Sequence, residues 1–382
     1  MSWRWSWLPF AGLLIILPYP GTVAARLLLL VLGFVIATTW YLKTAPTERV
    51  ALPCKLPLVV WWVVGLASLT YALDPIYSVG ELKNELGYTL LALFSFFVVG
   101  QQRDAALFAQ RALGFGMAIM ACWSISTWVV NDFLWLESGG HGGVGVVSTY
   151  VVTALPVLFW LALEDPHVAG RRAAQSLIAC ALLVAAISTQ RAAWPALAAE
   201  LAVVTILLAR NGRISVSRRL AMGLVIAILV LLPMLVLLIT LHRWGNVQNL
   251  SDNSRLLFWP SVLSTIADNP FMGVGFGRHA MKIAYPDLIP TYETQLWHAH
   301  NLFLNYGLAL GLPGALALLA LFAAWGRFFW RNAKTTAGIA GCALVVGVVA
   351  RNQFNDFFVR DMSLLFWALC GLFAGMCLTR RH

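Results

Sequence analysis

Apolar residues in this sequence come in long runs that are separated by short polar stretches. Several runs, such as residues 22–42, 145–163, 193–209, 220–241 and 300–326, are close to the ~20 residues that a helix needs to cross a bilayer core of about 30 Å. A backbone inside hydrocarbon must satisfy its own hydrogen bonds, which an α-helix does within one segment. We therefore predict an all-α, polytopic membrane protein.

The remaining sequence agrees with this fold class. Charged residues make up only 11% of the 382 residues, against about a quarter in a soluble domain. The alternating pattern of an outer-membrane β-barrel is absent from the sequence. We expect one transmembrane domain over residues 1–382, with about 12 helices and both ends in the cytoplasm. The other predicted spans are residues 8–17, 56–72, 86–100, a run that ends near 130, 173–188, 335–350 and 361–379.

The basic net charge of +10 follows from this topology and does not indicate a nucleic-acid partner. Of the 26 Lys and Arg residues, 17 fall in segments that we predict to be cytoplasmic. Membrane insertion favours basic residues in cytoplasmic loops. Most acidic residues fall on the outer side, including the segment from Asp74 to Glu85 between two spans. The expected partners therefore include membrane lipids and exclude nucleic acid.

The long polar segment, residues 242–299, is predicted to be an outer loop between the ninth and tenth helices. Within it, residues 254–267 place apolar side chains at helical spacing, which favours an amphipathic helix on the membrane surface. Its apolar positions are Leu256, Trp259, Leu263 and Ile266. Pro260 is expected to kink this helix or to begin its second part. A glycine-rich turn from Asn269 to Gly277 follows and ends at Arg278 and His279.

His298 and His300 close this loop at the mouth of the run 300–326. The unperturbed pKa of histidine lies near neutrality, so the pair suits proton transfer. Residence at the water–lipid interface, as expected for Trp297, is the alternative. Zinc binding would need a third strong ligand, and no H-E-x-x-H motif, cysteine pair or Asp-x-Asp occurs. We therefore expect no bound metal ion.

Arginines accompany these histidines on the outer side. Arg191 lies in the turn 188–195, within a residue or two of apolar runs, where an arginine usually has a partner or a function. Guanidinium forks bind phosphate bidentately. A phosphate contact is favoured for Arg191, whereas for Arg278 and Arg351 phosphate binding and a structural ion pair both stay open. The outward polar set is Arg191, Arg255, Arg278, His279, His298, His300, Asn301, Asn305, Arg351, Asn355 and Asp356.

Other motifs carry less information. The six cysteines lack C-x-x-C spacing and are interpreted as small apolar side chains. The glycine cluster at residues 139–143 lacks the Lys-Ser/Thr ending of a phosphate loop, so we interpret it as a flexible outer turn. No serine lies in the context of a nucleophile elbow.

Several short motifs occur in a fixed order along the chain. They are Thr189-Gln190-Arg191, Ser254-Arg255 followed by Trp259, Asn269-Pro270 leading to Gly273-Val274-Gly275-Phe276-Gly277, and His298-x-His300-Asn301. Together with the helix count and the outer loop before the last three helices, they make the chain similar to the bacterial O-antigen ligases. These belong to a larger membrane-protein family that includes the Wzy polymerases. The resemblance covers nearly the whole chain.

The resemblance implies a GT-C-type glycosyltransferase of lipopolysaccharide biosynthesis in the bacterial inner membrane. Such ligases take a glycan from undecaprenyl diphosphate in the periplasm and join it to a sugar hydroxyl of lipid A–core, with inversion and without metal or nucleotide. Arg191 and Arg255 would bind the diphosphate, with Arg278 as a further candidate. His300 would be the base, with His298 as the less certain histidine. Asn301, Asn305 and Asp356 are expected to support them.

Two other functions compete with ligation. A Wzy-type polymerase or a protein O-oligosaccharyltransferase would use the same chemistry on another acceptor. A lipid-glycan transporter would use the histidines as a proton relay, and transporters place ionisable residues near the middle of helices. Here these residues cluster at the outer helix ends, and Glu200 is the main exception. The pattern therefore favours an enzyme.

Overall fold

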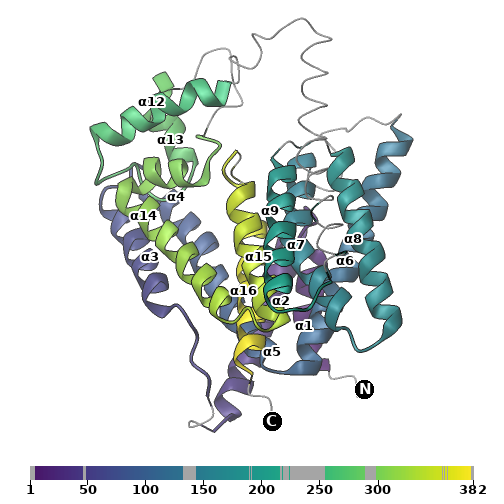
Figure 1. Cartoon of the computed structure of the whole chain (residues 1–382). Coiled ribbons are helices and arrows are strands. Elements are labelled where there is room, and N and C mark those ends of the chain that lie inside the picture. The colour runs from purple at the N-terminus through teal and green to yellow at the C-terminus, as the bar shows by residue number, and fades with distance from the viewer. Residues whose placement is uncertain are drawn as a thin grey trace, which may run out of the picture.

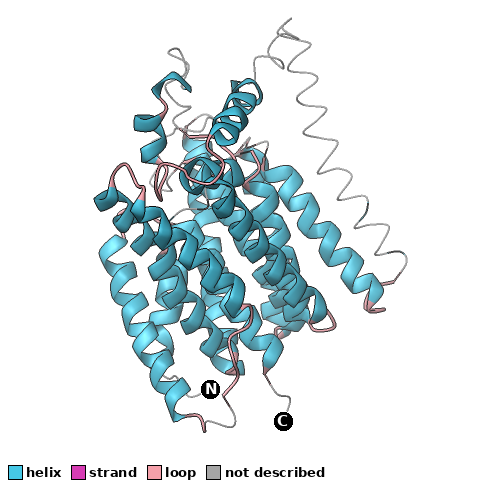
Figure 2. Cartoon of the chain, turned by 90° about the vertical axis from the view of Figure 1, so that its left-hand side faces the viewer, coloured by secondary structure: helices cyan, strands magenta, loops and turns pink. Residues whose placement is uncertain are grey.

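The structure is a computed structural model that describes residues 5–45, 49–131, 143–188, 190, 192–215, 217, 223, 254–288, 298–354, 356, 358 and 360–379, without the side chains of 254–257, 282 and 287. Within this part the chain consists of helices and connecting loops, with no strand (Figure 2). The helices are α1 (Leu8–Ile16), α2 (Val23–Lys43), α3 (Lys55–Ala67), α4 (Pro75–Leu82), α5 (Tyr88–Gly100), α6 (Arg103–Val130), α7 (Val144–Glu164), α8 (Val168–Ile187), α9 (Ala193–Arg210), α12 (Ser254–Asp268), α13 (His279–Ala284), α14 (Leu302–Arg331), α15 (Thr336–Arg351) and α16 (Arg360–Leu378).

Eight of the described helical stretches are long and apolar enough to cross a membrane, with residues 75–100 counted as one. Three shorter apolar helices accompany them at Trp5–Ile16, Lys55–Thr70 and Thr336–Arg351. Each of these eleven stretches, eight and three, falls where the sequence predicted a span. The span predicted at 220–241 lies almost wholly outside the described residues, so the count of about 12 remains a prediction.

The helices form a bundle whose turns gather at two ends (Figure 1). At one end, Asn211 donates to the Ala333 carbonyl at 2.6 Å and Arg213 donates to Thr336 Oγ1 at 2.6 Å. There too, Arg111 donates to both carboxylate oxygens of Asp165, and these hydrogen bonds hold the pKa of Asp165 below its ordinary value. At the other end lie α12 and α13, above α14 and α4 (Figure 1). The turns at the first end are ones that the sequence predicted to share one side of the membrane; which side that is stays a prediction.

The centre of the bundle is the contact between α5 and α16, where glycines let two backbones approach closely. A Cβ at Gly371 would overlap the carbonyl oxygen of Leu93, and one at Gly375 would overlap that of Phe97. Small residues at helix contacts serve the same purpose in other membrane bundles, because dispersion contacts replace the hydrophobic effect there. Trp367 of α16 is fully buried beside Trp61, with ring centroids 5.7 Å apart.

The acidic segment 74–85 differs from its expected form as a connection. Asp74 caps α4 by accepting a hydrogen bond from the Tyr77 amide at 2.9 Å, and Pro75 opens the helix. The chain then continues through a π-helical turn, Lys83–Gly87, into α5. Capping and a proline at the first position are strong helix-start signals. The segment is therefore the first part of one long helix, which buries Ser78, Glu81 and Glu85 against neighbouring elements.

Helix α14 is broken at Gly311, which has φ 72° and ψ −175°. Only glycine adopts this conformation at low cost. The break frees backbone groups, and the loop after α12 satisfies them: Val274 and Gly275 donate to the carbonyls of Leu308 and Ala309 at 3.2 and 3.0 Å. In return, Leu312 donates to the Pro270 carbonyl at 2.8 Å. The loop 270–277 is thus inserted into the break in α14.

The glycines of this loop make the insertion possible. A Cβ at Gly273 would overlap the backbone of Ala309, and one at Gly275, which has φ 105°, would overlap Ala72. Gly277 has φ 111° and lies against Tyr77. The glycine-rich stretch therefore lets the loop backbone pass between α14 and α4.

The bounds of α12 confirm the helix predicted over residues 254–267, but the buried face of this helix differs from the predicted one. Phe258, Val262 and Ile266 pack with Leu308 of α14, while Leu263, expected on the apolar face, is 54% exposed. Pro260 lies inside one helix instead of starting a second. The sequence 256–266 carries two overlapping apolar stripes, and the position of α14 decides which one is buried.

We predict that Gly273→Ala destabilises the protein, because its methyl group has no space beside Ala309. Overpacking of this kind costs about 1–3 kcal/mol. Gly80→Ala is the matched control, since no atom lies within 4 Å of a Cβ at that helical position. Thermal unfolding in detergent measures both variants. An unchanged unfolding temperature for Gly273→Ala would contradict the insertion of the loop into α14.

Candidate active site

The start of α14 is fixed by Asn301. Its Oδ1 accepts hydrogen bonds from the amides of Phe303 and Leu304 at 3.0 and 3.1 Å, which caps the helix. Its Nδ2 donates to the Gln353 carbonyl at 2.9 Å, in the turn after α15. Asn301 thus holds the end of the histidine motif against a second segment far away in the sequence.

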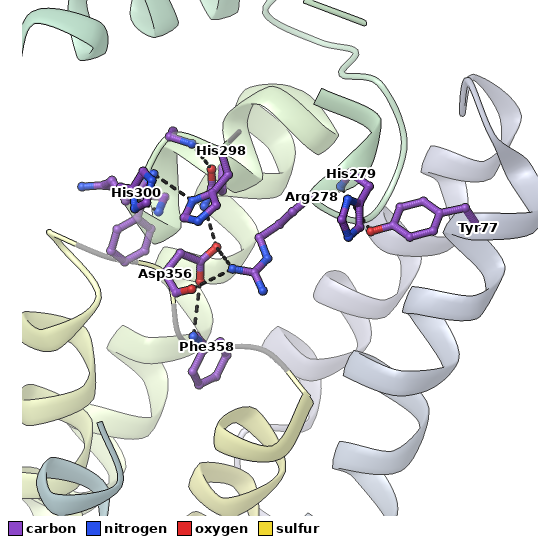
Figure 3. Close-up of polar contacts among 11 residues, drawn as sticks. Tyr77, Arg278, His279, His298, His300, Asp356 and Phe358 are labelled. Carbon is purple, nitrogen blue, oxygen red and sulfur yellow. Dashed lines mark hydrogen bonds and ion pairs between the residues drawn. The ribbon is translucent and has the colours of Figure 1, made fainter. Parts of the chain in front are cut away.

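His298 and His300 lie side by side just before this cap (Figure 3). Their ring centroids are 3.9 Å apart, and the residues are 5% and 9% exposed. His300 has φ 50°, a left-handed conformation that non-glycine residues seldom adopt. Its amide donates to Nδ1 of His298 at 3.0 Å. Because Nδ1 of His298 accepts this bond, the neutral ring carries its proton on Nε2 and can donate from there.

Asp356 and Asn305 hold the histidine motif from below. Asn305 Nδ2 donates to Asp356 Oδ2 at 2.5 Å, and Asn305 Oδ1 accepts from the amide of Ala299 at 2.7 Å. Ala299 is the residue between the two histidines, so this chain of bonds links the Asp356 carboxylate to the backbone of the motif. The Phe358 amide donates to the other carboxylate oxygen at 3.3 Å. The Ala299 amide, the Asn305 side chain, the Asp356 carboxylate and the Phe358 amide therefore form one connected network.

Arg278 reaches the same carboxylate from the inserted loop (Figure 3). Its Nη1 donates to the Asp356 backbone carbonyl at 2.7 Å and lies 3.8 Å from Oδ2. Asp356 is therefore located between Arg278 on one side and His298 on the other (Figure 3). The neighbouring His279 is turned away and forms an edge contact with Tyr77, with centroids 5.6 Å apart.

A pocket of about 320 Å³, its open mouth included, lies beside this network. Its polar lining consists of Glu85, Arg278, Asn305, Tyr306 and Asp356, and its remaining walls are apolar. The two histidines do not line it. Glu85 is buried, so the pocket places a second carboxyl group close to the Arg278–Asp356 pair.

Glu85 belongs to a stripe that sequence reasoning missed as part of the site. Tyr77, Glu81 and Glu85 follow one another at four-residue spacing, which places them on one face of a helix. Glu81 accepts from Arg360 at 3.3 Å, and Tyr77 accepts from the amide of His279 at 3.2 Å. The four-residue spacing of these side chains is visible in the sequence. It indicates a shared face only if the segment is helical, and from the sequence alone we interpret the segment as a connection between two spans.

Helix α12 is tied to the histidine motif by Trp259. The indole Nε1 donates to the carbonyl of Ala299 at 2.8 Å. Position 255 precedes Trp259 by one helical turn, which places it on the same face of α12. The side chain of Arg255 lies outside the described residues, as do Arg191 and Asn355.

Arg351 occupies a different place from the other candidates. It is fully buried at the end of α15, and its Nη2 donates to Ser148 Oγ of α7 at 3.1 Å. This contact ties α15 to the start of α7 and favours a structural role. Among the described residues, no three His, Cys, Asp or Glu side chains lie close enough together to form a metal site.

The fold and the site define a multi-pass helical membrane protein with a buried histidine, carboxylate and arginine site at one end of its bundle. Residues 176–319 match the family model described as O-Antigen ligase. This match confirms, over these residues, the resemblance to the O-antigen ligases that the sequence predicted. The matched range contains Arg278, His298 and His300 but ends before Asp356. No curated protein matches the chain.

We predict that Asn305→Ala loosens the histidine motif, because it leaves the Ala299 amide and the Asp356 carboxylate without this partner. A buried group left unsatisfied costs about 1–3 kcal/mol, so amide exchange in residues 298–302 should speed up about tenfold. Hydrogen–deuterium exchange measures this directly. Asn332→Ala removes an amide at the other end of α14 and should leave the motif unchanged. Equal protection in wild type and Asn305→Ala would contradict the positioning role.

Proposed function

We propose that this protein is an O-antigen ligase that transfers a glycan from undecaprenyl diphosphate to a sugar hydroxyl of lipid A–core. The observation that carries the proposal is the pair His298–His300, held through Asn305 to Asp356 and accompanied by Arg278. This places groups suited to proton transfer next to a group suited to phosphate. The family match to the O-antigen ligases supports this kind of substrate.

The distribution of charge supports a site on the periplasmic face of the inner membrane. The helix ends opposite the site carry a dense set of basic residues, and such ends remain in the cytoplasm during insertion. The set includes Arg103, Arg171, Arg172, Arg210, Arg213, Arg331 and Lys334. The histidine motif lies at the other end, where α14 begins and Trp259 of α12 donates to Ala299 (Figure 1).

Arginine side chains would stabilise the leaving group. A sugar joined to a diphosphate already has a good leaving group, so the main task is to neutralise the charge that develops on the departing phosphate. We assign this task to Arg191 and Arg255. Arg278 is a third candidate, and Asp356 sets the position of its guanidinium. Guanidinium groups supply the charge that a metal ion supplies elsewhere, so the proposed reaction is independent of metal.

His300 would act as the base. As the acceptor hydroxyl attacks the anomeric carbon, an imidazole nitrogen takes its proton, and attack from the face opposite the diphosphate inverts that carbon. His298 would have an orienting role, because its Nδ1 accepts a hydrogen bond from the His300 amide. This division of roles agrees with the cap at Asn301, which fixes the backbone directly after His300.

The alternatives differ in acceptor rather than in chemistry. A polymerase would offer a second carrier-linked glycan to the same base, and a protein O-oligosaccharyltransferase would offer a protein hydroxyl. The description of the matched family favours the ligase among them. A transporter is favoured less, because the histidines lie at the end of the bundle, and Glu200, buried in α9, is the exception to this pattern.

We predict that Arg191→Ala and Arg255→Ala each lower the rate of transfer about a hundredfold, the effect of roughly 3 kcal/mol lost from a developing phosphate charge. Lysine at either position should restore little activity, since a point charge does not replace a planar fork. Arg331→Ala, at the opposite end of α14, is the control and should behave as wild type. Wild-type turnover by either test variant would remove that arginine from the site.

We predict that His300→Ala loses transfer while it keeps affinity for the undecaprenyl-diphosphate donor, because the arginines bind that end. His298→Ala should be milder. Wild-type transfer should also slow as the pH falls below neutrality, because imidazolium cannot accept a proton whereas arginine stays charged. Single-turnover rates against pH, with donor binding measured in parallel, check this. Normal transfer by His300→Ala, or loss of donor binding as complete as the loss of transfer, would contradict the base assignment.

A further inference from the structure

Two aromatic side chains from separate segments meet beside the histidine motif. Trp259 comes from α12 and Phe354 from the turn after α15. Their ring centroids are 6.1 Å apart and their planes are inclined by 31°. Aromatic pairs at this distance usually fill a core. Here, however, Trp259 is only half-buried and Phe354 is 47% exposed.

The segments that carry these two rings are both bonded to the histidine motif. Trp259 donates to the carbonyl of Ala299, between His298 and His300. Phe354 follows Gln353, whose carbonyl accepts from Asn301 at 2.9 Å, and Asn352 accepts from the Leu302 amide at 3.0 Å. The indole of Trp259 and the backbone next to Phe354 are therefore held in place by bonds to the motif. The aromatic pair is a fixed surface at the edge of the site.

Such a surface matches one chemical feature of sugars. A six-membered sugar ring presents a face made of C–H bonds, which is apolar and slightly positive. The face of an aromatic ring is slightly negative and takes part in such contacts at low entropy cost. The polar edge of the same sugar would remain available to the histidines. A lipid contact would need no such link to the motif.

We propose that Trp259 and Phe354 form an aromatic shelf that stacks the C–H face of a sugar ring beside His300. This inference rests on the proposed function, because it makes the shelf a specificity element for the sugar that enters the transfer site. The ring can come from the acceptor or from the donor glycan. The two sources share this chemistry, and the experiment separates them.

The test compares Phe354→Leu, which removes the ring, with Phe354→Trp, which keeps one. If the acceptor sugar stacks on the shelf, Phe354→Leu raises the KM for lipid A–core about tenfold and leaves kcat unchanged, while Phe354→Trp stays near wild type. If the donor sugar stacks there, the Kd of the undecaprenyl-diphosphate-linked glycan rises instead. The control is Phe271→Leu, which removes a phenylalanine of the inserted loop whose side chain is 76% exposed. This variant should change neither constant.

A binding measurement keeps the shelf distinct from the proposed function. Saturation-transfer NMR with free core oligosaccharide and with free glycan reports ring contacts without any transfer reaction. A signal from sugar C–H protons that Phe354→Leu abolishes and Phe271→Leu preserves supports the shelf, even if the wild type transfers nothing. Wild-type constants and NMR signals in Phe354→Leu, or equal losses in Phe271→Leu, would overturn the shelf while leaving the transfer reaction intact.

Discussion

The site depends on hydrogen bonds between a broken helix and the loop that enters its break. Gly311 interrupts α14, and the freed carbonyls of Leu308 and Ala309 accept from Val274 and Gly275. Unsatisfied backbone groups in a membrane bundle are costly, so a break of this kind persists only where other groups replace the missing bonds. The replacement brings Arg278, at the end of the loop, to the same place as the first half of α14, which begins after His300.

A second set of bonds depends on this arrangement. Arg278 and Asn305 both contact Asp356, and Asn305 also accepts a hydrogen bond from the amide of Ala299. A buried network in which the members satisfy one another is rigid. Rigidity is what proton transfer in a site requires, because a base must lie within hydrogen-bond distance of its proton. The unusual backbone of His300 is held between this network and the cap at Asn301.

The sequence predicted the helices well, because apolar length alone determines a membrane span. The expected spans 22–42 and 145–163 correspond to Val23–Lys43 and Val144–Glu164. Proximity within the site was harder to foresee. Glu85 lines the pocket because its helical segment packs beside Arg278 and Asp356, and the buried face of α12 follows from its contact with Leu308. Both are set by neighbours distant in sequence, which no local pattern specifies. Composition also could not show that Arg351 is buried against Ser148.

The central claim is that this site transfers a carrier-linked glycan to a core sugar. The most direct measurement uses purified protein in lipid nanodiscs, in buffer with EDTA. Undecaprenyl-diphosphate-linked glycan is the donor, and lipid A–core competes with a second carrier-linked glycan as acceptor. Our account predicts inverted linkage of the glycan to lipid A–core, with little growth of the carrier-linked chain. Growth of the carrier-linked glycan alone, or transfer that EDTA abolishes and a metal ion restores, would contradict it.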